Sequence, residues 1–397
     1  MKLEAPRLPV TYVDTGATLK ELITALETEE VIGLDAERAS GFRYSHRAYL
    51  FQIAIRGKRI YLVDPEAFEG EEWTRDLATA MASTTWILHA ATQDLPCLLE
   101  LGIAPTSLID TELGARLAGL ERFGLASLAL SLLDIELAKE HSAADWSQRP
   151  LSKEMLNYAA LDVDVLFELW DAMEATLREQ GKLSWAIEEF TNLVAFKARV
   201  PVKEPWRLLP GMSKIKDLRR QKIAASLWQA RNEVAKTQDV APGRLIPDRS
   251  IAAVVNEPPA TKSQLAKNKQ FHGRASRSML DLWWQAIASA GQLEIGAEER
   301  NEDHIPNHRS WEKRFPEAHS RLSTCRPLLV EKAQELSMPV ENLLTPDILR
   351  RLCFEPEADC AAQLRALGAR EWQIEICAPL IVAGFGQTRE DSSPAPA

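Results

Sequence analysis

Two carboxylates stand at the end of the first apolar segment of the chain. Asp35 and Glu37 follow the apolar residues 31–34 and are separated by a single residue. Because side chains of a strand alternate between its faces, an Asp-x-Glu pair projects on one side. Such carboxylates repel each other unless a cation lies between them, and hard oxygen ligands suit Mg²⁺ or Mn²⁺. A solvated strand end explains the pair at least as well as a metal site does.

A second polar group follows the apolar residues 86–89. His89 ends this segment, and Asp94 opens the helix that we predict next. We expect His89 to be a structural residue at a strand end rather than a ligand. The helix dipole favours an acid in a first helical turn, so Asp94 has a purely structural explanation as well.

A third group lies on a helix that we predict late in the first half. Tyr158 and Asp162 are four residues apart, so they share a face of this helix. The two alanines between them let another part of the molecule approach that turn closely. A core tyrosine beside a solvated aspartate is the alternative interpretation.

Alternating strands and helices would position these side chains. Apolar runs predict strands at 31–34, 50–55, 60–63, 86–89 and 107–110, and helices are predicted at 71–82, 93–101 and 152–180. Ser152 and Glu154 give the last helix a cap and an acid in its first turn. This order predicts a mixed sheet flanked by helices.

Strand signals fade beyond a proline-containing segment at residues 200–205. The helices predicted there are 215–234, 276–290, 322–336, 339–343, 347–352, 360–367 and 372–383. The chain is therefore divided into an α/β domain at 1–204 and all-helical domains at 205–295 and 296–388. A polar tail rich in Pro and Ala, residues 389–397, is expected to be disordered.

Charge is distributed unevenly over the 397 residues, whose net charge is −10. Residues 206–295 hold 15 basic and 7 acidic side chains, which leaves +8 there and −18 elsewhere. Such asymmetry is typical of a nucleic-acid-binding module, although a solvated helical face also explains it. The basic candidates for nucleic-acid binding are Lys214, Lys216, Arg219, Lys267, Lys269 and Arg274. From residue 296 onward 12 basic residues face 17 acidic ones, which favours a structural role.

Composition excludes several classes of protein. The chain is 46% apolar and 26% charged, and no apolar run approaches the roughly 20 residues that span a bilayer. Its start lacks the apolar stretch of a signal peptide. The five cysteines show no C-x-x-C spacing, so neither a zinc module nor a disulfide scaffold is indicated. We therefore expect a cytoplasmic protein without a membrane partner.

The three polar groups occur in the order of a known enzyme family. Asp-x-Glu on a first strand, Asp after a central strand and Tyr-x-x-x-Asp on a late helix resemble the DEDD 3′–5′ exonucleases in their tyrosine variant, of the ribonuclease D type. Asn157 stands where the histidine variant would carry His. The resemblance covers roughly residues 10–200, and the further matching stretches are 40–50, 110–111 and 145–152. It implies a ribonuclease H-like α/β nuclease domain.

The resemblance also implies two-metal hydrolysis of phosphodiester bonds. Asp35 would bridge two Mg²⁺ or Mn²⁺ ions, with Glu37 and Asp162 completing one site and Asp94 holding the second ion. Tyr158 would orient the attacking water, because an unperturbed phenol with a pKa near 10 is a poor base at neutral pH.

The loop after the first acids would form a wall of the substrate pocket. Ala36 stands where family members usually carry Thr, at no cost in metal ligands, and Arg38 is either a phosphate contact or a surface charge. Phe42 and Tyr44 are candidates for contacts with the RNA bases.

The helical half extends the resemblance. Residues 218–220, 227–231 and 242–248 resemble the HRDC domain, and the segment after about residue 309 resembles a second, more divergent copy. A G-x-x-x-x-G-K-[ST] phosphate loop is missing from the sequence, which excludes a helicase motor. The resemblance implies a monomer that trims the 3′ ends of tRNA precursors and other stable RNAs and releases nucleoside 5′-monophosphates.

Two alternatives stay open at this point. A DNA 3′–5′ exonuclease would use the same acids, because discrimination between RNA and DNA lies in contacts to the 2′-hydroxyl. A catalytically dead RNA-binding adaptor is the other, although all four acids and the tyrosine are present. No obligate protein partner is indicated.

Overall fold

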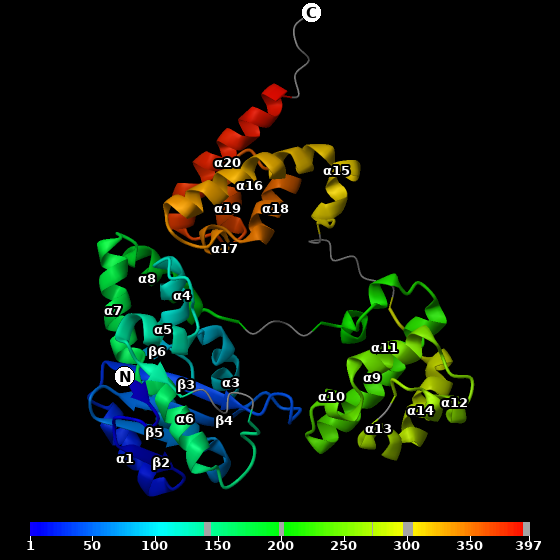
Figure 1. The fold of residues 1–397 in the computed structure, drawn as a ribbon, viewed down its shortest axis with the longest axis horizontal. Coiled ribbons are helices and arrows are strands. Elements are labelled where there is room, and N and C mark those ends of the chain that lie inside the picture. Colours follow the sequence, from blue (N-terminus) through cyan, green and yellow to red (C-terminus); the bar gives the residue numbers. More distant parts are fainter. Residues whose placement is uncertain (139–143, 198–201, 272, 297–304, 392–397) are drawn as a thin grey trace, which may run out of the picture.

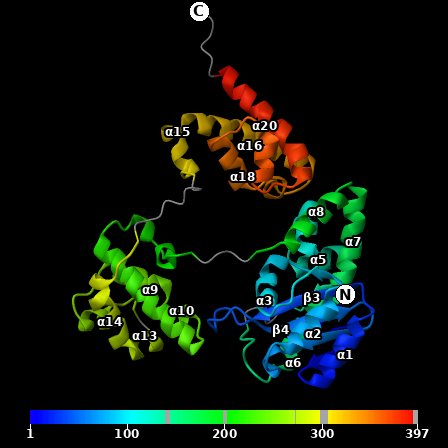
Figure 2. The same ribbon diagram turned by 180° about the vertical axis from the view of Figure 1, so that it is seen from behind.

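The computed structural model describes residues 1–138, 144–197, 202–271, 273–296 and 305–391. They form an α/β domain, a first helical unit (residues 205–296) and a second helical unit (residues 305–391), which lie at the corners of a triangle in both views (Figures 1 and 2). The predicted domain limits fall beside residues 198–201 and 297–304, which are outside the described residues. The limits themselves stay predictions.

A mixed sheet forms the centre of the α/β domain, as the sequence predicts, and it has a sixth strand, β2, that the sequence patterns do not predict. Its strands follow the order β2-β5-β4-β3-β6-β7. Strand β4 runs antiparallel to both β3 and β5, whereas the β2–β5, β3–β6 and β6–β7 pairs are parallel. The strands are β2 Val10–Val13, β3 Val31–Arg38, β4 Ala48–Ile55, β5 Arg59–Val63, β6 Thr85–Leu88 and β7 Ser107–Asp110. A small parallel pair, β1 Lys2–Leu3 and β8 Glu136–Leu137, joins the amino-terminal segment to the domain.

Helices cover both faces of this sheet, so every residue of β4 is buried. The helices of the domain are α1 Gly16–Leu26, α2 Glu72–Met81, α3 Leu95–Glu100, α4 Thr111–Leu117, α5 Leu125–Leu133, α6 Lys153–Asp164, α7 Leu166–Glu179 and α8 Leu183–Val194, with 3-10 turns η1 Pro65–Ala67 and η2 Ala91–Gln93. On one face, α1 and α2 pack against Phe51 and Ile53. On the other, α6 packs against Leu50, Ala54 and Leu62. The side chains of β3 that point toward α6 therefore lie in the layer between the sheet and this helix.

The single helix predicted at 152–180 is wrong in one respect, because the structure divides it into α6 and α7 at Val165. Arg7 lies at this break. Its guanidinium donates to the backbone carbonyl of Asp164 at 2.8 Å, and its backbone N–H donates to the Asp164 carboxylate at 2.7 Å. A contact with an outside residue, rather than a Pro or Gly in the sequence, accompanies the interruption.

The first helical unit has a core of its own, in which Trp206, Phe271 and Trp283 are buried. Its long helix begins at Leu218, capped by the Asp217 side chain, and the predicted helix 276–290 is interrupted at Met279. The elements are η3 Pro205–Leu208, η4 Met212–Lys214, α9 Leu218–Gln238, α10 Pro242–Leu245, α11 Asp248–Asn256, α12 Lys262–Lys267, α13 Arg274–Ser278, α14 Leu280–Ser289 and η5 Ala290–Gln292.

The second helical unit contains a similar succession of long and short helices. They are η6 His308–Ser310, α15 Trp311–Arg314, α16 Pro316–Glu335, α17 Val340–Leu343, α18 Pro346–Phe354, α19 Cys360–Ala366 and α20 Glu371–Asp391. Both units place a four-residue helix and then a nine-residue helix after a long one. Helix α20 continues three residues into the predicted disordered tail, and residues 392–397 lie outside the described residues. None of the helices in the described ranges combines the length and apolarity needed to cross a bilayer.

Candidate active site

Strand β3 and helix α6 bring together three of the four acids that were predicted to bind metal. Asp35 and Glu37 project from β3, and Asp162 projects from α6 across the same layer. Carboxylate oxygens of these three residues all lie within 4.8 Å of one another. The chain positions of these residues differ by up to 127, so the cluster exists only in the folded protein.

Small residues allow α6 to lie this close to the sheet. A Cβ atom at Gly33 would lie 3.4 Å from the Ala54 Cβ and 3.5 Å from the backbone oxygen of Val163. Ala159 and Ala160 are fully buried in the same layer. The part of the molecule that the two alanines allow to approach α6 closely is therefore the sheet.

Asp94 joins the cluster from the turn after β6. Its side chain is buried, shares a hydrogen bond with Asp35 and lies 3.7 Å from the Arg38 guanidinium. Arg38 thus faces the acids rather than open solvent. The turn passes through Ala90 in the left-handed conformation, with φ of 60°.

Asp110 holds that turn in place, and the sequence patterns do not assign it this role. Its carboxylate accepts hydrogen bonds from the backbone N–H groups of Ala90 at 3.1 Å and Ala91 at 2.9 Å, while also capping α4. An Asp between a strand and a helix is a capping signal in any sequence. Only the fold reveals that it also fixes the approach to Asp94.

Burial and mutual repulsion disfavour the charged forms of the four acids. Burial raises the pKa of Asp35 to about 6, and the pKa values of Glu37, Asp94 and Asp162 rise well above their usual range. For these three, the neighbouring Asp35 carboxylate adds to the effect of burial. Converging carboxylates of this kind are typical of a divalent cation site. The donor set, made entirely of carboxylate oxygens, fits Mg²⁺ or Mn²⁺.

Tyr158 lies beside the acids on α6. Its hydroxyl donates a hydrogen bond to Asp162, and burial together with the Asp162 charge raises the pKa of the phenol. The ring packs at 6.2 Å from the buried Trp146. At neutral pH the side chain is therefore a protonated hydrogen-bond donor held in one orientation.

A cavity of about 430 Å³ opens over the cluster. It is lined by the four acids, Tyr158, Arg38 and His89, and also by residues that were not site candidates, among them Gln93, Glu112 and Leu125. His89 Nδ1 lies 3.0 Å from the Thr111 hydroxyl, and burial lowers its pKa to about 4. The imidazole is therefore neutral at pH 7 and held by a neighbouring side chain.

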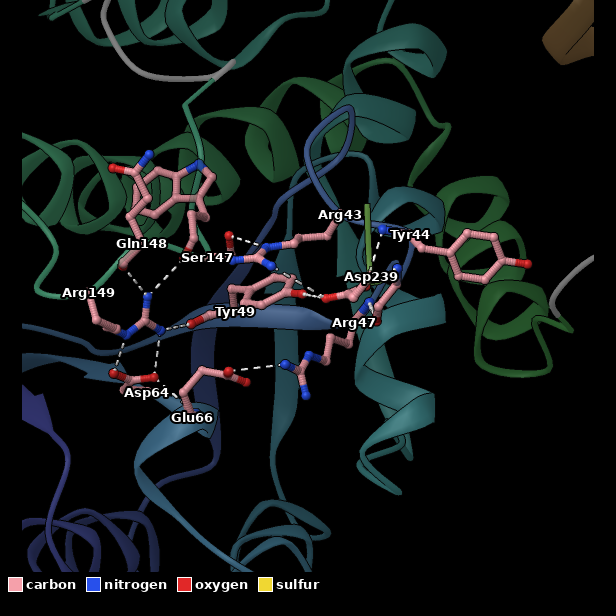
Figure 3. A network of polar contacts seen from close by, with 12 residues as sticks. Arg43, Tyr44, Arg47, Tyr49, Asp64, Glu66, Ser147, Gln148, Arg149 and Asp239 are labelled. Atoms are coloured by element: carbon pink, nitrogen blue, oxygen red, sulfur yellow. Dashed lines mark hydrogen bonds and ion pairs between the residues drawn. The ribbon is translucent and has the colours of Figure 1, made fainter. Parts of the chain in front are cut away.

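The structure does not bring Phe42 and Tyr44 into this cavity. They belong to the β3–β4 loop, residues 39–47, which contacts the first helical unit (Figure 3). The Arg244 guanidinium lies 4.1 Å from the Phe42 ring centroid, and the Tyr44 hydroxyl donates to Asn232 at 3.1 Å. Contact with RNA bases stays a prediction for both residues.

The Asp239 carboxylate organises the same contact from the end of α9. It accepts hydrogen bonds from the backbone N–H groups of Tyr44 at 3.2 Å and Ser45 at 3.0 Å, and from the Tyr49 hydroxyl at 3.4 Å (Figure 3). The loop that continues from the acid-bearing strand is thus held by a residue nearly two hundred positions away.

The six basic residues predicted to bind RNA are all exposed on the first helical unit. Within the described ranges, none of them forms an ion pair. They occupy η4, the start of α9, and the segment from α12 to α13, and they are Lys214, Lys216, Arg219, Lys267, Lys269 and Arg274. None lies in the cavity over the acids.

Three family models match consecutive parts of the chain. A 3′–5′ exonuclease model matches residues 10–178, and an HRDC domain model matches residues 220–287. A model described as a 3′ to 5′ exonuclease C-terminal domain matches residues 304–385. That the second helical unit is a further HRDC copy stays a prediction, supported by its similar order of helices.

Known proteins and solved structures resemble this chain over much of its length. Ribonuclease D of Pseudomonas paraeruginosa is 28% identical over 89% of this chain and 91% of its own, and that of Zymomonas mobilis is 30% identical over 66% and 67%. A crystal structure of a protein from Bifidobacterium adolescentis has a TM-score of 0.87 at 34% identity, covering 97% of this chain and 99% of its own. Escherichia coli RNase D, at 21% identity and a TM-score of 0.69 over 95% and 99%, has the same fold. The chain described here belongs to the ribonuclease D family and is a 3′–5′ exoribonuclease.

Proposed function

We propose that this exoribonuclease trims the 3′ ends of tRNA precursors and other stable RNAs with the help of two divalent cations, and that it releases nucleoside 5′-monophosphates. The observation that supports the proposal most strongly is that carboxylate oxygens of Asp35, Glu37 and Asp162 lie within 4.8 Å of one another. Asp94 shares a hydrogen bond with Asp35. Escherichia coli RNase D, which has the same fold, is an exoribonuclease involved in structured RNA processing, and this supports the substrate class.

We infer that the four acids would hold two ions between them. Asp35, Glu37 and Asp162 would hold one Mg²⁺ or Mn²⁺, and Asp94 would hold a second that shares Asp35. When bound, such ions activate a water molecule and stabilise the leaving 3′ oxygen.

The remaining residues of the cavity would orient the reactants. The Tyr158 hydroxyl, which donates a hydrogen bond to Asp162, would orient the attacking water. The Arg38 guanidinium lies 3.7 Å from the Asp94 carboxylate and would contact the scissile phosphate. We expect the exposed basic residues of the first helical unit to hold the body of a structured RNA through its phosphates, which carry no sequence information.

We also propose that the protein is a monomer of the cytoplasm. All five cysteines are free and buried, which agrees with a reducing compartment. DNA cleavage by the same acids is the second candidate, because the cluster itself does not distinguish the two sugars.

Product analysis on a tRNA with a 3′ extension tests the proposal. We expect the wild-type protein to release nucleoside 5′-monophosphates with Mg²⁺ and none in EDTA, and to degrade matched DNA far more slowly. Asp35→Asn should abolish turnover, whereas Tyr158→Phe should leave weakened but measurable cleavage. A near-normal rate for Asp35→Asn with Mg²⁺ would show that the metal assignment is wrong.

A further inference from the structure

Gln52 is a polar side chain in the middle of the sheet. It lies in β4 with no exposed surface, and within the described residues neither its amide nitrogen nor its amide oxygen has a hydrogen-bond partner. Buried amides in folded proteins are nearly always paired, because burial removes their hydrogen bonds to water. An apolar side chain of similar length would fill the position at lower cost in free energy, so the amide calls for an explanation.

The strand register places Gln52 directly opposite Asp35. The antiparallel pairing of β3 and β4 aligns Asp35 with Gln52, and the β4–β5 pairing aligns Gln52 with Leu62. Directly opposed residues project to the same face, with Cβ atoms about 4.5–5.5 Å apart. The amide of Gln52 therefore belongs to the layer that holds the Asp35 carboxylate.

The neighbours of Gln52 in this layer are apolar. Leu50 and Ala54 flank it along β4, Leu62 lies across from it on β5, and Ala160 and Val163 of α6 cover the same face. The contact of Gly33 with Val163 confirms that these alternating positions face α6. Among these side chains, the opposed Asp35 carboxylate is the acceptor that an amide N–H can match.

We propose that Gln52 is a positioning residue for Asp35, and that its amide N–H donates a hydrogen bond to the Asp35 carboxylate when the acids hold divalent cations. The proposal rests on the proposed function of the cluster. In the structure described here Asp35 is engaged by Asp94 and by the backbone N–H of Ala36, and Gln52 has no such bond. Residues that form hydrogen bonds with a metal ligand fix the orientation of that ligand. Their loss typically lowers metal affinity or activity by about 10–100-fold.

The variant Gln52→Met separates this role from ordinary packing. Methionine has nearly the same size, fills the apolar layer and removes only the amide. We expect the melting temperature measured in EDTA to rise, because an unpaired buried amide is gone. We expect the affinity for Mn²⁺, measured by calorimetry without RNA, to fall by about tenfold or more. The kcat on RNA should fall while KM changes little.

Leu62→Met is the matched control. It alters packing on the other side of Gln52 and leaves the amide intact, so its Mn²⁺ affinity should equal that of the wild-type protein. The inference is overturned if Gln52→Met binds Mn²⁺ as tightly as the wild type, or if it loses stability in EDTA in proportion to its loss of affinity. If instead the wild-type protein binds no Mn²⁺ and Asp35→Asn is fully active, the proposed function fails first.

Discussion

The two helical units are attached to the α/β domain in different ways. The second shares one continuous apolar core with it, in which Trp372 stacks on Trp185 at 4.9 Å and 12°. The first has a separate core and contacts the domain through polar groups of the β3–β4 loop (Figure 3). A shared core unfolds with the domain, whereas a polar contact can open and close without unfolding either side.

Buried polar groups strengthen the shared junction. The Lys182 ammonium, itself buried, donates to the backbone carbonyls of Leu117 at 2.8 Å and Leu336 at 2.5 Å. The buried Glu189 carboxylate accepts from the Trp372 indole at 3.2 Å and lies 3.1 Å from Arg370. The second unit is therefore joined to the α/β domain by buried polar contacts as well as by apolar packing.

Trp372→Ala should give the largest effect. It removes a buried indole and its stacking contact with Trp185, so we expect a loss of about 3–5 kcal/mol in the free energy of unfolding, with the α/β domain and second unit still unfolding together. Chemical denaturation followed by circular dichroism measures this. Trp283→Ala, a buried tryptophan of the separate core, should lower only the transition of the first unit. If both variants lowered one common unfolding transition equally, the two helical units would not differ in how they are attached to the α/β domain.

Gly119→Ala should disturb the shared junction more gently. Gly119 has φ of 78°, and an added Cβ would lie 2.0 Å from the backbone oxygen of Ser337 in the second unit. Gly102→Ala is the matched control, because Gly102 has φ of 74° and open space around it. The control should cost about 1–2 kcal/mol for the backbone alone. Gly119→Ala should cost roughly 1–3 kcal/mol more, and equal melting temperatures would contradict this.

Asp239→Gly should open the polar contact without unfolding either unit. Asp239 adopts φ of 46°, which glycine accommodates freely, so the change removes the carboxylate and adds no strain. We expect a larger radius of gyration in X-ray scattering, and a change in unfolding free energy below about 0.5 kcal/mol. Asp239→Asn, which keeps an acceptor oxygen, should stay closer to the wild type. A compact Asp239→Gly protein would argue against the contact.

Lys214→Gln should have the smallest effect. Loss of one phosphate contact reduces the slope of log K against log salt by about 0.7–0.9. Lys313→Gln makes the same change at an exposed lysine of the second unit and should leave the slope unchanged. Filter binding of a structured RNA at several salt concentrations compares the two, and identical slopes would place the RNA elsewhere.

Local patterns predict what depends on local sequence. The apolar runs that become β4, β5 and β6 are recognisable because those strands are largely buried. Strand β2, at the sheet edge with a single buried residue, leaves no comparable signal. The four acids are found because their order along the chain is distinctive. The role of Asp110, the position of Gln52 opposite Asp35 and the contact made by Phe42 depend on partners brought in by the fold, so no local pattern reveals them.

The hydrogen bonds from Arg7 to Asp164, at the end of α6, have a practical consequence for handling the enzyme. Asp164, which Arg7 binds, stands two residues after the catalytic candidate Asp162. Shortening the segment ahead of β2 to attach a label would therefore loosen the helix that carries the site candidates Tyr158 and Asp162. Helix α20 ends on the far side of the molecule (Figure 1), which makes its end the safer place for a fluorophore or a surface anchor.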